Sequence, residues 1–349
     1  MAEDRLGDLL EAERQQGYFS AAYVECGFLN QPQAKFQKFL SSEPETADIF
    51  DLASLTKALV TGPLVHRLLT EKKLSFHALL KSWAPDSLHV PASFLQLPTE
   101  EILGHCSGLP AWWNFWIDVL DRSSVISRSQ ALMRMQEVLQ RIPLREKKSD
   151  LYSDVGYILL GCALELLKEQ SLSLQFQTLL LAINFPETLP LGFAPDLASD
   201  ANHFIPTGYC AIRERVLWGE VHDENCAAFG GISGHAGLFG TGEAVSTFLK
   251  TYAATTEGRA YFIANEKARL STSREGLLGL RRGHGLSAAV FADGQSMGHL
   301  GFTGTAFWLD WSTQKYAIFL SNRVVSGRVS PRMTDLRKKV FQLLDERLD

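Results

Sequence analysis

Apolar residues alternate with polar ones near both ends of the chain and take helical spacing between them. Residues 4–16 place three leucines on one side of a predicted helix, and residues 20–29 follow as a strand. Residues 49–54 predict a strand or turn that leads into a long apolar helix. Gly62 and Pro63 fall inside that helix and predict a kink or break, because proline cannot donate a backbone hydrogen bond.

The middle of the chain has mostly helical spacing. Residues 131–142, 155–170 and 243–254 predict helices, and a glycine-rich loop at 229–242 precedes the last of them. An aromatic cluster at residues 111–120 predicts either a wall over a cleft or core packing.

Strand patterns return in the last part of the chain. Residues 285–291, 298–311 and 315–323 alternate in polarity and predict an antiparallel meander, followed by an amphipathic helix at 330–348. We therefore predict an α+β fold, an antiparallel sheet flanked by helices with a mostly helical inserted domain. In this interpretation residues 1–57 and 286–349 form an α/β domain from both termini. Residues 58–285 form the mostly helical domain.

Composition and charge exclude several classes of protein. The chain of 349 residues is 46% hydrophobic and 21% charged, which indicates a packed core rather than disorder. A net charge of −5 and the lack of a Lys/Arg-rich stripe argue against nucleic acid as a partner. The five cysteines are scattered without a C-x-x-C pair, so we expect no disulfide framework, and we expect no metal or other cofactor.

The apolar runs are all shorter than the roughly 18 residues that span a membrane. The acidic start lacks the basic and apolar regions of a signal peptide, so we expect a cytoplasmic protein. An export signal trimmed before residue 1 is compatible with the same start. The oligomeric state does not follow from the sequence.

The motif S-x-x-K occurs twice. Ser312 and Lys315 lie between two alternating runs and predict an exposed hairpin turn. Ser54 and Lys57 instead open an apolar helix, where a spacing of three residues puts both side chains on one face. Backbone N–H groups at a helix N-terminus favour negative charge on Ser54, and Lys57 is placed to accept its proton or to support it electrostatically. The alternative is a lysine that extends to the surface.

Two further motifs carry candidate chemistry. Tyr152 precedes an apolar helix in the stretch YSD, and a phenolate beside a lysine ammonium is a plausible general base. The alternative is a half-buried tyrosine followed by a helix-capping Asp154. His299 begins an H-x-G motif whose glycine, Gly301, would let a ligand approach the backbone closely. His235 begins a second H-x-G motif, and we expect it to hold its glycine-rich loop by hydrogen bonds.

Taken in this order, S-x-x-K, Y-x-[ND] and [KH]-x-G resemble the motifs of the penicillin-recognising serine hydrolases. That superfamily includes class C β-lactamases, D-alanyl-D-alanine peptidases and related esterases. The resemblance covers most of the chain. Its landmarks, in family order, are FDLASLTK, ILGHCSGLPAW, YSDVGYILLG, GGISGHAGLF, GHLGFTGTAFW and LSNRV.

The resemblance implies roles for matching positions. Ser54 would be the acylated nucleophile, Lys57 its neighbour in proton transfer, and Tyr152 a general base and later an acid. The backbone N–H groups of Ser54 and Phe302 would form the oxyanion hole. The site would lie in a cleft between the sheet domain and the helical domain.

The substrate-binding positions depart from the β-lactamase pattern. The resemblance implies that His299 and Gly301 line the substrate strand, yet β-lactamases have a lysine where this chain has His299. Losing that fixed cation weakens recognition of a substrate carboxylate, and Arg323 or Arg328 is the predicted replacement. Asp154 stands near the site where β-lactamases usually have an amide.

That carboxylate affects the predicted chemistry of the site. Asp154 would raise the pKa of Lys57, which would shift acceptance of the serine proton towards Tyr152. The sequence thus predicts a serine hydrolase that forms an acyl-Ser54 intermediate with a small-molecule or peptide substrate. Esters, amides and peptides are favoured over β-lactams. The alternatives are a true class C β-lactamase or DD-peptidase, and a catalytically inactive binding or scaffold protein of the same fold.

Other hydrolase classes fit the sequence less well. Residues 231–235 fail the G-x-S-x-G motif at its last glycine. Cys106 or Cys226 as a nucleophile competes with the commoner role of a buried structural cysteine. A metal site at residues 222–224 lacks a second histidine four residues away.

Overall fold

Strands and helices follow one another in a mixed order along the chain in the computed structural model of this protein. The structure describes residues 4–119, 127–145, 150–197, 201–283, 296–328 and 331–348. The strands are β1 (Ala21–Phe28), β2 (Phe36–Ser41), β3 (Phe50–Asp51), β4 (Leu191–Phe193), β5 (Gly208–Cys210), β6 (Arg215–Leu217), β7 (Leu238–Gly240), β8 (Arg281–Arg282), β9 (Met297–Leu300), β10 (Ala306–Leu309) and β11 (Lys315–Ser321). The helices are α1 (Arg5–Gln15), α2 (Gly62–Glu71), α3 (Ala92–Leu95), α4 (Thr99–Leu103), α5 (Phe115–Val119), α6 (Arg128–Leu139), α7 (Asp154–Lys168), α8 (Leu172–Ala182), α9 (Glu224–Ala228), α10 (Gly242–Ala254), α11 (Thr256–Ser271) and α12 (Arg332–Asp345).

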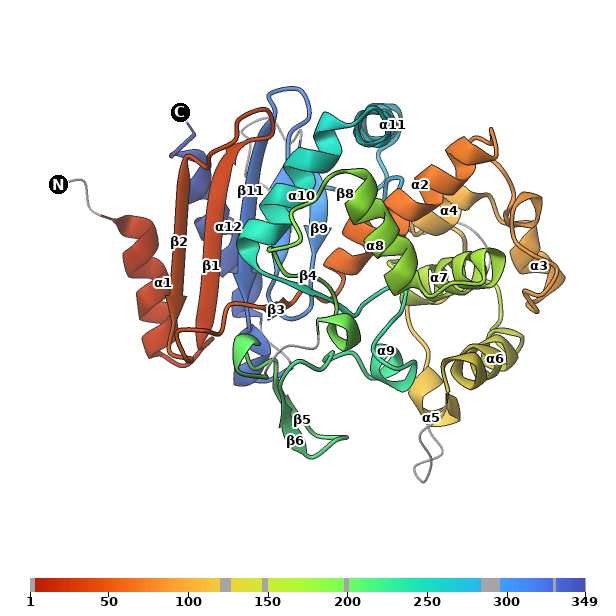
Figure 1. Ribbon diagram of the computed structural model, residues 1–349, viewed down its shortest axis with the longest axis horizontal. Helices are drawn as coiled ribbons and strands as arrows, with labels where there is room; N and C mark the ends of the chain where they lie inside the picture. Colours follow the sequence, from red (N-terminus) through yellow and green to blue (C-terminus); the bar gives the residue numbers. More distant parts are fainter. Residues whose placement is uncertain are drawn as a thin grey trace.

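A six-stranded antiparallel sheet joins the two ends of the chain (Figure 1). Its strand order is β2-β1-β11-β10-β9-β8. Strand β1 pairs with β11 in the register that places Val24 opposite Phe319. Since β1 lies near the N-terminus and β11 near the C-terminus, this interior pair of the sheet forms only when both ends of the chain are in place.

Helices cover both faces of this sheet. Helices α1 and α12 pack on one face, where Val24 and Phe319 meet Leu336 and Val340 in an apolar cluster. Helix α10 crosses the other face and contacts β1 and β11 (Figure 1). Strand β1 is therefore buried on both sides, which explains its small and apolar residues.

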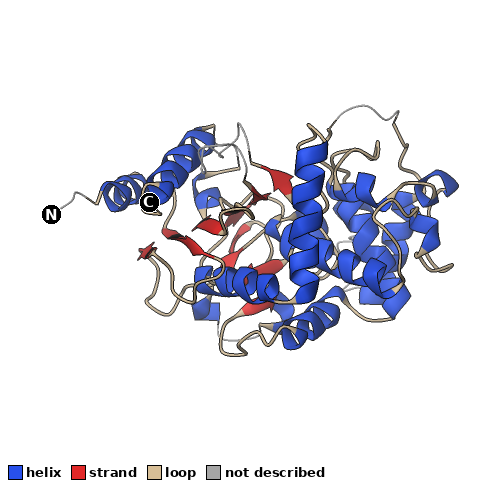
Figure 2. Cartoon of the chain, turned by 90° about the horizontal axis from the view of Figure 1, so that it is seen from above, coloured by secondary structure: helices blue, strands red, loops and turns tan. Residues whose placement is uncertain are grey.

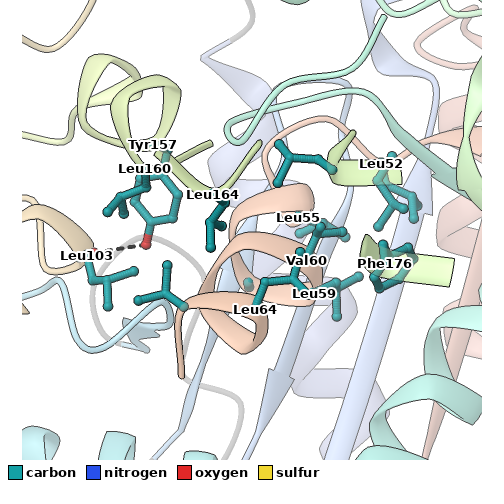
Figure 3. Close-up of a cluster of buried hydrophobic side chains, with 14 of the residues drawn as sticks. Leu52, Leu55, Leu59, Val60, Leu64, Leu103, Tyr157, Leu160, Leu164 and Phe176 are labelled. Atoms are coloured by element: carbon teal, nitrogen blue, oxygen red, sulfur yellow. Dashed lines mark hydrogen bonds between the residues drawn. The ribbon is translucent and has the colours of Figure 1, made fainter. Parts of the chain in front are cut away.

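The other half of the molecule is mostly helical. The view in Figure 2 shows strands enclosed by helices in one half, and helices joined by long loops in the other. Nearly every residue in the first three turns of α7 is buried, as expected for a helix that is apolar on all sides. Figure 3 shows Tyr157 of this helix donating a hydrogen bond to the carbonyl oxygen of Leu103, at 2.9 Å, beside Leu160 and Leu164. One continuous apolar cluster links this region to the sheet.

The predicted fold class is confirmed by this arrangement. The predicted N-terminal helix and first strand correspond to α1 and β1. The disturbance expected at Gly62 and Pro63 takes the form of a π-helical segment, Lys57–Thr61, directly before α2. The predicted strand at 285–291 lies outside the described residues.

The predicted domain boundaries stay a prediction. Strand β8 and helices α10 and α11 belong to the segment 58–285, yet they pack with the six-stranded sheet. Helix α10 does so because its apolar face, which includes Val245 and Phe248, is buried. Along the described ranges, no helix is both long and apolar enough to cross a membrane.

Candidate active site

Ser54 lies at the junction between β3 and the helical segment that follows it. Ala53 has a φ of 48°, a left-handed conformation that is uncommon for a residue with a Cβ. A buried carboxylate, Asp51, holds this turn, because its Oδ1 accepts a hydrogen bond from the Ala53 N–H at 2.9 Å. The other oxygen of Asp51 accepts from the N–H of His222 at 2.8 Å. The tight turn presents the Ser54 side chain to a cleft.

Lys57 is fully buried directly behind Ser54, with 0% of its side chain exposed. Its Nζ donates to Ser54 Oγ at 2.9 Å and to the carbonyl oxygen of His235 at 3.0 Å. Asp154 Oδ1 lies 2.7 Å from the same nitrogen and forms an ion pair with it. The buried cation therefore has a counter-ion and is not a lysine that extends to the surface.

Tyr152 completes this group of side chains. Its side chain adjoins those of Lys57 and Ser54, and its ring centroid lies 4.9 Å from the lysine Nζ. The hydroxyl, amine and phenol of the three predicted residues thus lie beside one another. They come from three distant parts of the sequence.

Electrostatics set the protonation states of the group. Burial alone would lower the pKa of Lys57, but the charge of Asp154, with Tyr152 beside it, raises that pKa above its ordinary value. Burial raises the pKa of Tyr152 too, and the opposing effect of the Lys57 charge does not cancel it. At neutral pH the resting group therefore holds an ammonium and a neutral phenol. The predicted effect of Asp154 on Lys57 has the expected direction, whereas a resting Tyr152 phenolate is disfavoured.

Phe302 lines the same cleft as Ser54 and lies in the turn between β9 and β10. Within the described part of the chain, neither the Phe302 N–H nor the Ser54 N–H has a backbone hydrogen-bond partner. Thr303 Oγ1 donates to the carbonyl oxygen of Asp51 at 2.7 Å, which ties this turn to the segment that carries Ser54. Two N–H groups are thus available for an oxyanion.

The cleft has a volume of about 400 Å³. Ser54, Phe302 and Trp112 lie on its wall, and the two aromatic side chains are 44% and 43% exposed, respectively. The lining residues are Asp51, Ala53, Ser54, Trp112, Asp154, Val221, His222, Asp223, Glu224, Ala236, Phe302, Thr303 and Arg328. The predicted aromatic cluster is therefore divided, with Trp112 on the cleft wall and Phe115 in the core.

A family model described as beta-lactamase matches residues 40–341. This chain belongs to the beta-lactamase family. As a member, it is a hydrolase of this family, and its fold is that of the penicillin-recognising enzymes.

Relatives of this beta-lactamase family member have several activities in their names. The N-acetylmuramyl-L-alanine amidase of Bacillus subtilis (strain 168) is 27% identical over 314 residues, which are 82% of this chain and 70% of the relative. The putative D-alanyl-D-alanine carboxypeptidase of Escherichia coli (strain K12) is 28% identical over 320 residues, 82% of this chain and 72% of that protein. The solved structure of EstCE1, a hydrolase with promiscuous acyltransferase activity, has a TM-score of 0.70 at 15% identity and covers 97% of both chains.

The predicted substrate-strand residues of this beta-lactamase family member lie behind the cleft wall. His299 is fully buried, and its Nδ1 lies 2.8 Å from the carbonyl oxygen of Leu300. Burial lowers the pKa of His299 well below its ordinary value, and the nearby Lys57 charge acts in the same direction, so the ring is neutral. The N–H of Gly301 donates to the carbonyl oxygen of Thr305 at 2.7 Å, so it is already used inside the protein. Substrate contacts by His299 and Gly301 stay a prediction.

The two predicted replacement cations differ in position. Arg323 is buried and donates to the carbonyl oxygens of Phe302, Gly327 and Arg328, so its guanidinium supports backbone rather than the cleft. Arg328 does line the cleft, where it forms an ion pair with Glu224 over the ring of Phe302. Arg323 is not among the residues that line the cleft, so the structure gives no support to Arg323 as a substrate ligand.

Two histidines outside the predicted catalytic group adjoin the site. His235 contacts Ser233 and Asp223 at 2.8 Å through its two ring nitrogens, and its carbonyl oxygen accepts from Lys57. His105 accepts a hydrogen bond from the Ser153 N–H at 3.0 Å, and its ring centroid lies 4.4 Å from that of Tyr152.

The sequence signals for these two histidines were partial. The second H-x-G motif indicated a loop-holding role for His235, and the geometry has that form. His105 lies in the landmark ILGHCSGLPAW, but nothing in that pattern indicated contact with Tyr152. Both histidines adjoin the Ser54–Lys57–Tyr152 group, His235 through its carbonyl oxygen at Lys57 and His105 through its ring beside Tyr152.

Proposed function

We propose that this chain is a serine acyl hydrolase that cleaves an ester or an amide through an acyl-Ser54 intermediate. The observation that carries the proposal is the position of Ser54 Oγ on the wall of a cleft, 2.9 Å from Lys57 Nζ. Tyr152 adjoins the same two side chains. Ser54 and Phe302 both line the cleft, and their N–H groups have no backbone hydrogen-bond partner in the described chain. These are the parts that nucleophilic acyl transfer requires.

The reaction has two balanced halves. In the first, Ser54 Oγ bonds to the carbonyl carbon, and its proton passes to the Lys57–Tyr152 pair. The N–H groups of Ser54 and Phe302 stabilise the oxyanion. Collapse of the tetrahedral adduct breaks the bond to the alcohol or amine, which leaves with that proton. In the second half, water adds to the acyl group by the same route, and the carboxylic acid leaves as Ser54 regains its proton.

Proton acceptance requires that the Lys57–Tyr152 pair first lose a proton. Both groups have raised pKa values: that of Lys57 because Asp154 and Tyr152 together outweigh the lowering effect of burial, and that of Tyr152 because of burial. The reactive form therefore becomes more abundant as pH rises. We infer that the rate of acylation increases from neutral to mildly alkaline pH.

The charges of the cleft favour substrates without an obligatory carboxylate. His299 is neutral, and Arg328 is already paired with Glu224. Asp154 and Asp223 place two further carboxylates on the lining. A substrate carboxylate would meet repulsion rather than a free cation, which argues against efficient β-lactam turnover. The name of the amidase relative supports an amide substrate.

A substrate screen tests this proposal. The wild-type protein is incubated with p-nitrophenyl esters, D-amino-acid p-nitroanilides and nitrocefin, beside Ser54→Ala. We expect turnover of an ester or anilide at a kcat/KM at least about tenfold above that for nitrocefin, and none of it in Ser54→Ala. Faster nitrocefin turnover would favour a true β-lactamase. A folded wild-type protein that turns over no probe would favour the binding or scaffold protein.

A further inference from the structure

The turn from Gly301 to Thr305 carries one half of the proposed oxyanion hole. The Gly301 N–H donates to the Thr305 carbonyl at 2.7 Å, and the Gly304 N–H donates to the Gly301 carbonyl at 3.2 Å. On its cleft side, the Thr305 hydroxyl donates to the carbonyl oxygen of Leu52 at 3.1 Å. Together with Thr303, this bond fixes the turn against the segment that presents Ser54.

A buried arginine holds the same turn from the other side. Arg337 belongs to α12, the helix on the face of the sheet opposite α10, and only 9% of the residue is exposed. Its Nη2 donates to the carbonyl oxygen of Gly301 at 2.7 Å and to that of Thr305 at 3.0 Å. One nitrogen thus bridges the two ends of the turn.

The charge of Arg337 has no carboxylate partner among the residues that the structure describes, and its Nε has no hydrogen-bond acceptor there. A buried cation without a counter-ion is costly, and backbone carbonyl dipoles offset that cost only in part. A leucine or methionine would fill the space without this cost. The fold therefore keeps a positive charge behind the turn where apolar packing would be more stable.

The peptide unit that Arg337 contacts is the one that contributes to the oxyanion hole. The carbonyl of Gly301 and the N–H of Phe302 belong to one planar trans peptide and point in opposite directions. A hydrogen bond from the guanidinium to the oxygen fixes the plane of this peptide and so fixes the direction of the N–H. The positive charge also polarises the amide and strengthens the N–H as a donor. Arg323 fixes the next peptide by donating to the carbonyl oxygen of Phe302 at 2.6 Å.

We propose that Arg337 is a positioning residue for catalysis, which orients and polarises the Gly301–Phe302 peptide so that its N–H stabilises the oxyanion. This inference rests on the proposed function. Arg337 does not line the cleft, so it acts only through the backbone of the turn. Loss of its side chain therefore weakens binding of the tetrahedral adduct more than binding of the substrate.

The test compares Arg337→Met and Arg337→Lys with the wild-type protein. Lys338→Met is the matched control, because it removes a charge from the neighbouring exposed position of the same helix. For each folded variant, kcat and KM are measured with the best ester of the screen, and Ki is measured with phenylboronic acid. The boronate forms a bond with Ser54 Oγ and releases the serine proton to the Lys57–Tyr152 pair. It then places an anionic oxygen at the two N–H groups.

We expect kcat of Arg337→Met to fall by about 10- to 100-fold. This fall is no larger than the fall in kcat that removal of a whole oxyanion donor causes. KM should change by less than about threefold, and Ki for the boronate should rise in parallel with the fall in kcat. Arg337→Lys should recover part of the loss, since an ammonium still donates to the carbonyl oxygens. Lys338→Met should match the wild type.

Unchanged kcat and boronate Ki in a folded Arg337→Met would overturn the inference and leave the proposed function intact. If Arg337→Met does not fold, Arg337→Gln decides, since a folded Arg337→Gln with wild-type kcat and Ki, which has lost the charge, overturns the inference equally. A wild-type protein that neither hydrolyses the ester nor binds the boronate would overturn the proposed function, and the inference with it.

Discussion

The ion pair between Asp154 and Lys57 makes a quantitative prediction about stability. Asp154→Asn removes the counter-ion 2.7 Å from a lysine with no exposed side-chain surface. In the wild type, this carboxylate and its neighbours raise the folded-state pKa of Lys57 above the ordinary value, so the lysine is a buried ammonium at neutral pH. Without the carboxylate, Lys57 either keeps its charge without a counter-ion or gives up its proton, and both outcomes cost stability. A raised lysine pKa contributes stability that is fully present below the unfolded pKa and is lost as pH rises through the folded value.

The magnitude follows from the surroundings of the two charges. Removing one partner of a buried ion pair typically costs about 3 to 5 kcal/mol. Here the cost is reduced, because Lys57 keeps its hydrogen bonds to Ser54 Oγ and the His235 carbonyl oxygen. Asparagine also keeps one carbonyl oxygen near Nζ, and the Asp154 side chain is 19% exposed. We therefore expect Asp154→Asn to lose about 2 kcal/mol of unfolding free energy.

Urea unfolding at pH 7.5, followed by far-UV circular dichroism, measures this loss. The matched control is Asp86→Asn, which changes an exposed carboxylate and should stay within about 0.5 kcal/mol of the wild type. The double variant Lys57→Met/Asp154→Asn should be more stable than the sum of the two single losses by about 2 kcal/mol. A loss below about 0.5 kcal/mol in Asp154→Asn, with additive single effects, would refute this account of the buried pair.

Four further predictions concern the same region. Tyr152→Phe removes the hydroxyl beside Ser54 and Lys57 and should lower kcat/KM for an ester by about 100-fold or more, whereas full activity would exclude a role in proton transfer. In pH–rate profiles, the alkaline rise of kcat/KM should move to lower pH in Asp154→Asn, because losing the carboxylate lowers the pKa of Lys57; an unmoved profile would contradict this. Burial raises the pKa of Asp51 to about 6 against 3.8 unfolded, so the wild type should lose about 3 kcal/mol relative to Asp51→Asn between pH 3.5 and 7, and parallel stability curves would count against it. Trp112→Ala should raise KM for naphthyl esters about tenfold more than for acetate esters, the equivalent of about 1.4 kcal/mol of apolar contact, and equal effects would remove Trp112 from the acyl pocket.

The elements with strong periodicity could be predicted from the sequence. Residues 4–16 and 155–170 have apolar spacing that determines their helices, and α1 and α7 lie there. Strand β2 and the β5–β6 hairpin were not predicted. Both have exposed or alternating faces and depend on a neighbour for pairing, which a local pattern does not contain.

The convergence of Ser54, Lys57 and Tyr152 could be expected from motif order, because each motif has its own spacing and sequence context. The residues that surround these three side chains could not be predicted from the sequence. Asp51, His105 and Arg337 act through hydrogen bonds to backbone atoms far away in sequence, those of His222, Ser153 and Gly301, respectively. Such contacts have no sequence period and depend on the closed sheet and the packed helices.

The backbone likewise explains why glycine is required at one motif position. A Cβ at Gly301 would lie 1.9 Å from Thr305 Oγ1 and 2.9 Å from the carbonyl oxygen of Leu52. The turn that begins at this residue therefore requires glycine in any case, and the approach of a ligand to Gly301 stays a prediction.

The central claim is that Ser54 becomes acylated. The most direct measurement is the intact mass of the protein after incubation with a fluorophosphonate, followed by peptide mapping. The account predicts one adduct per chain, located on Ser54, absent from Ser54→Ala and formed much more slowly in Tyr152→Phe. An unmodified wild-type protein, or an adduct that persists in Ser54→Ala, would contradict it.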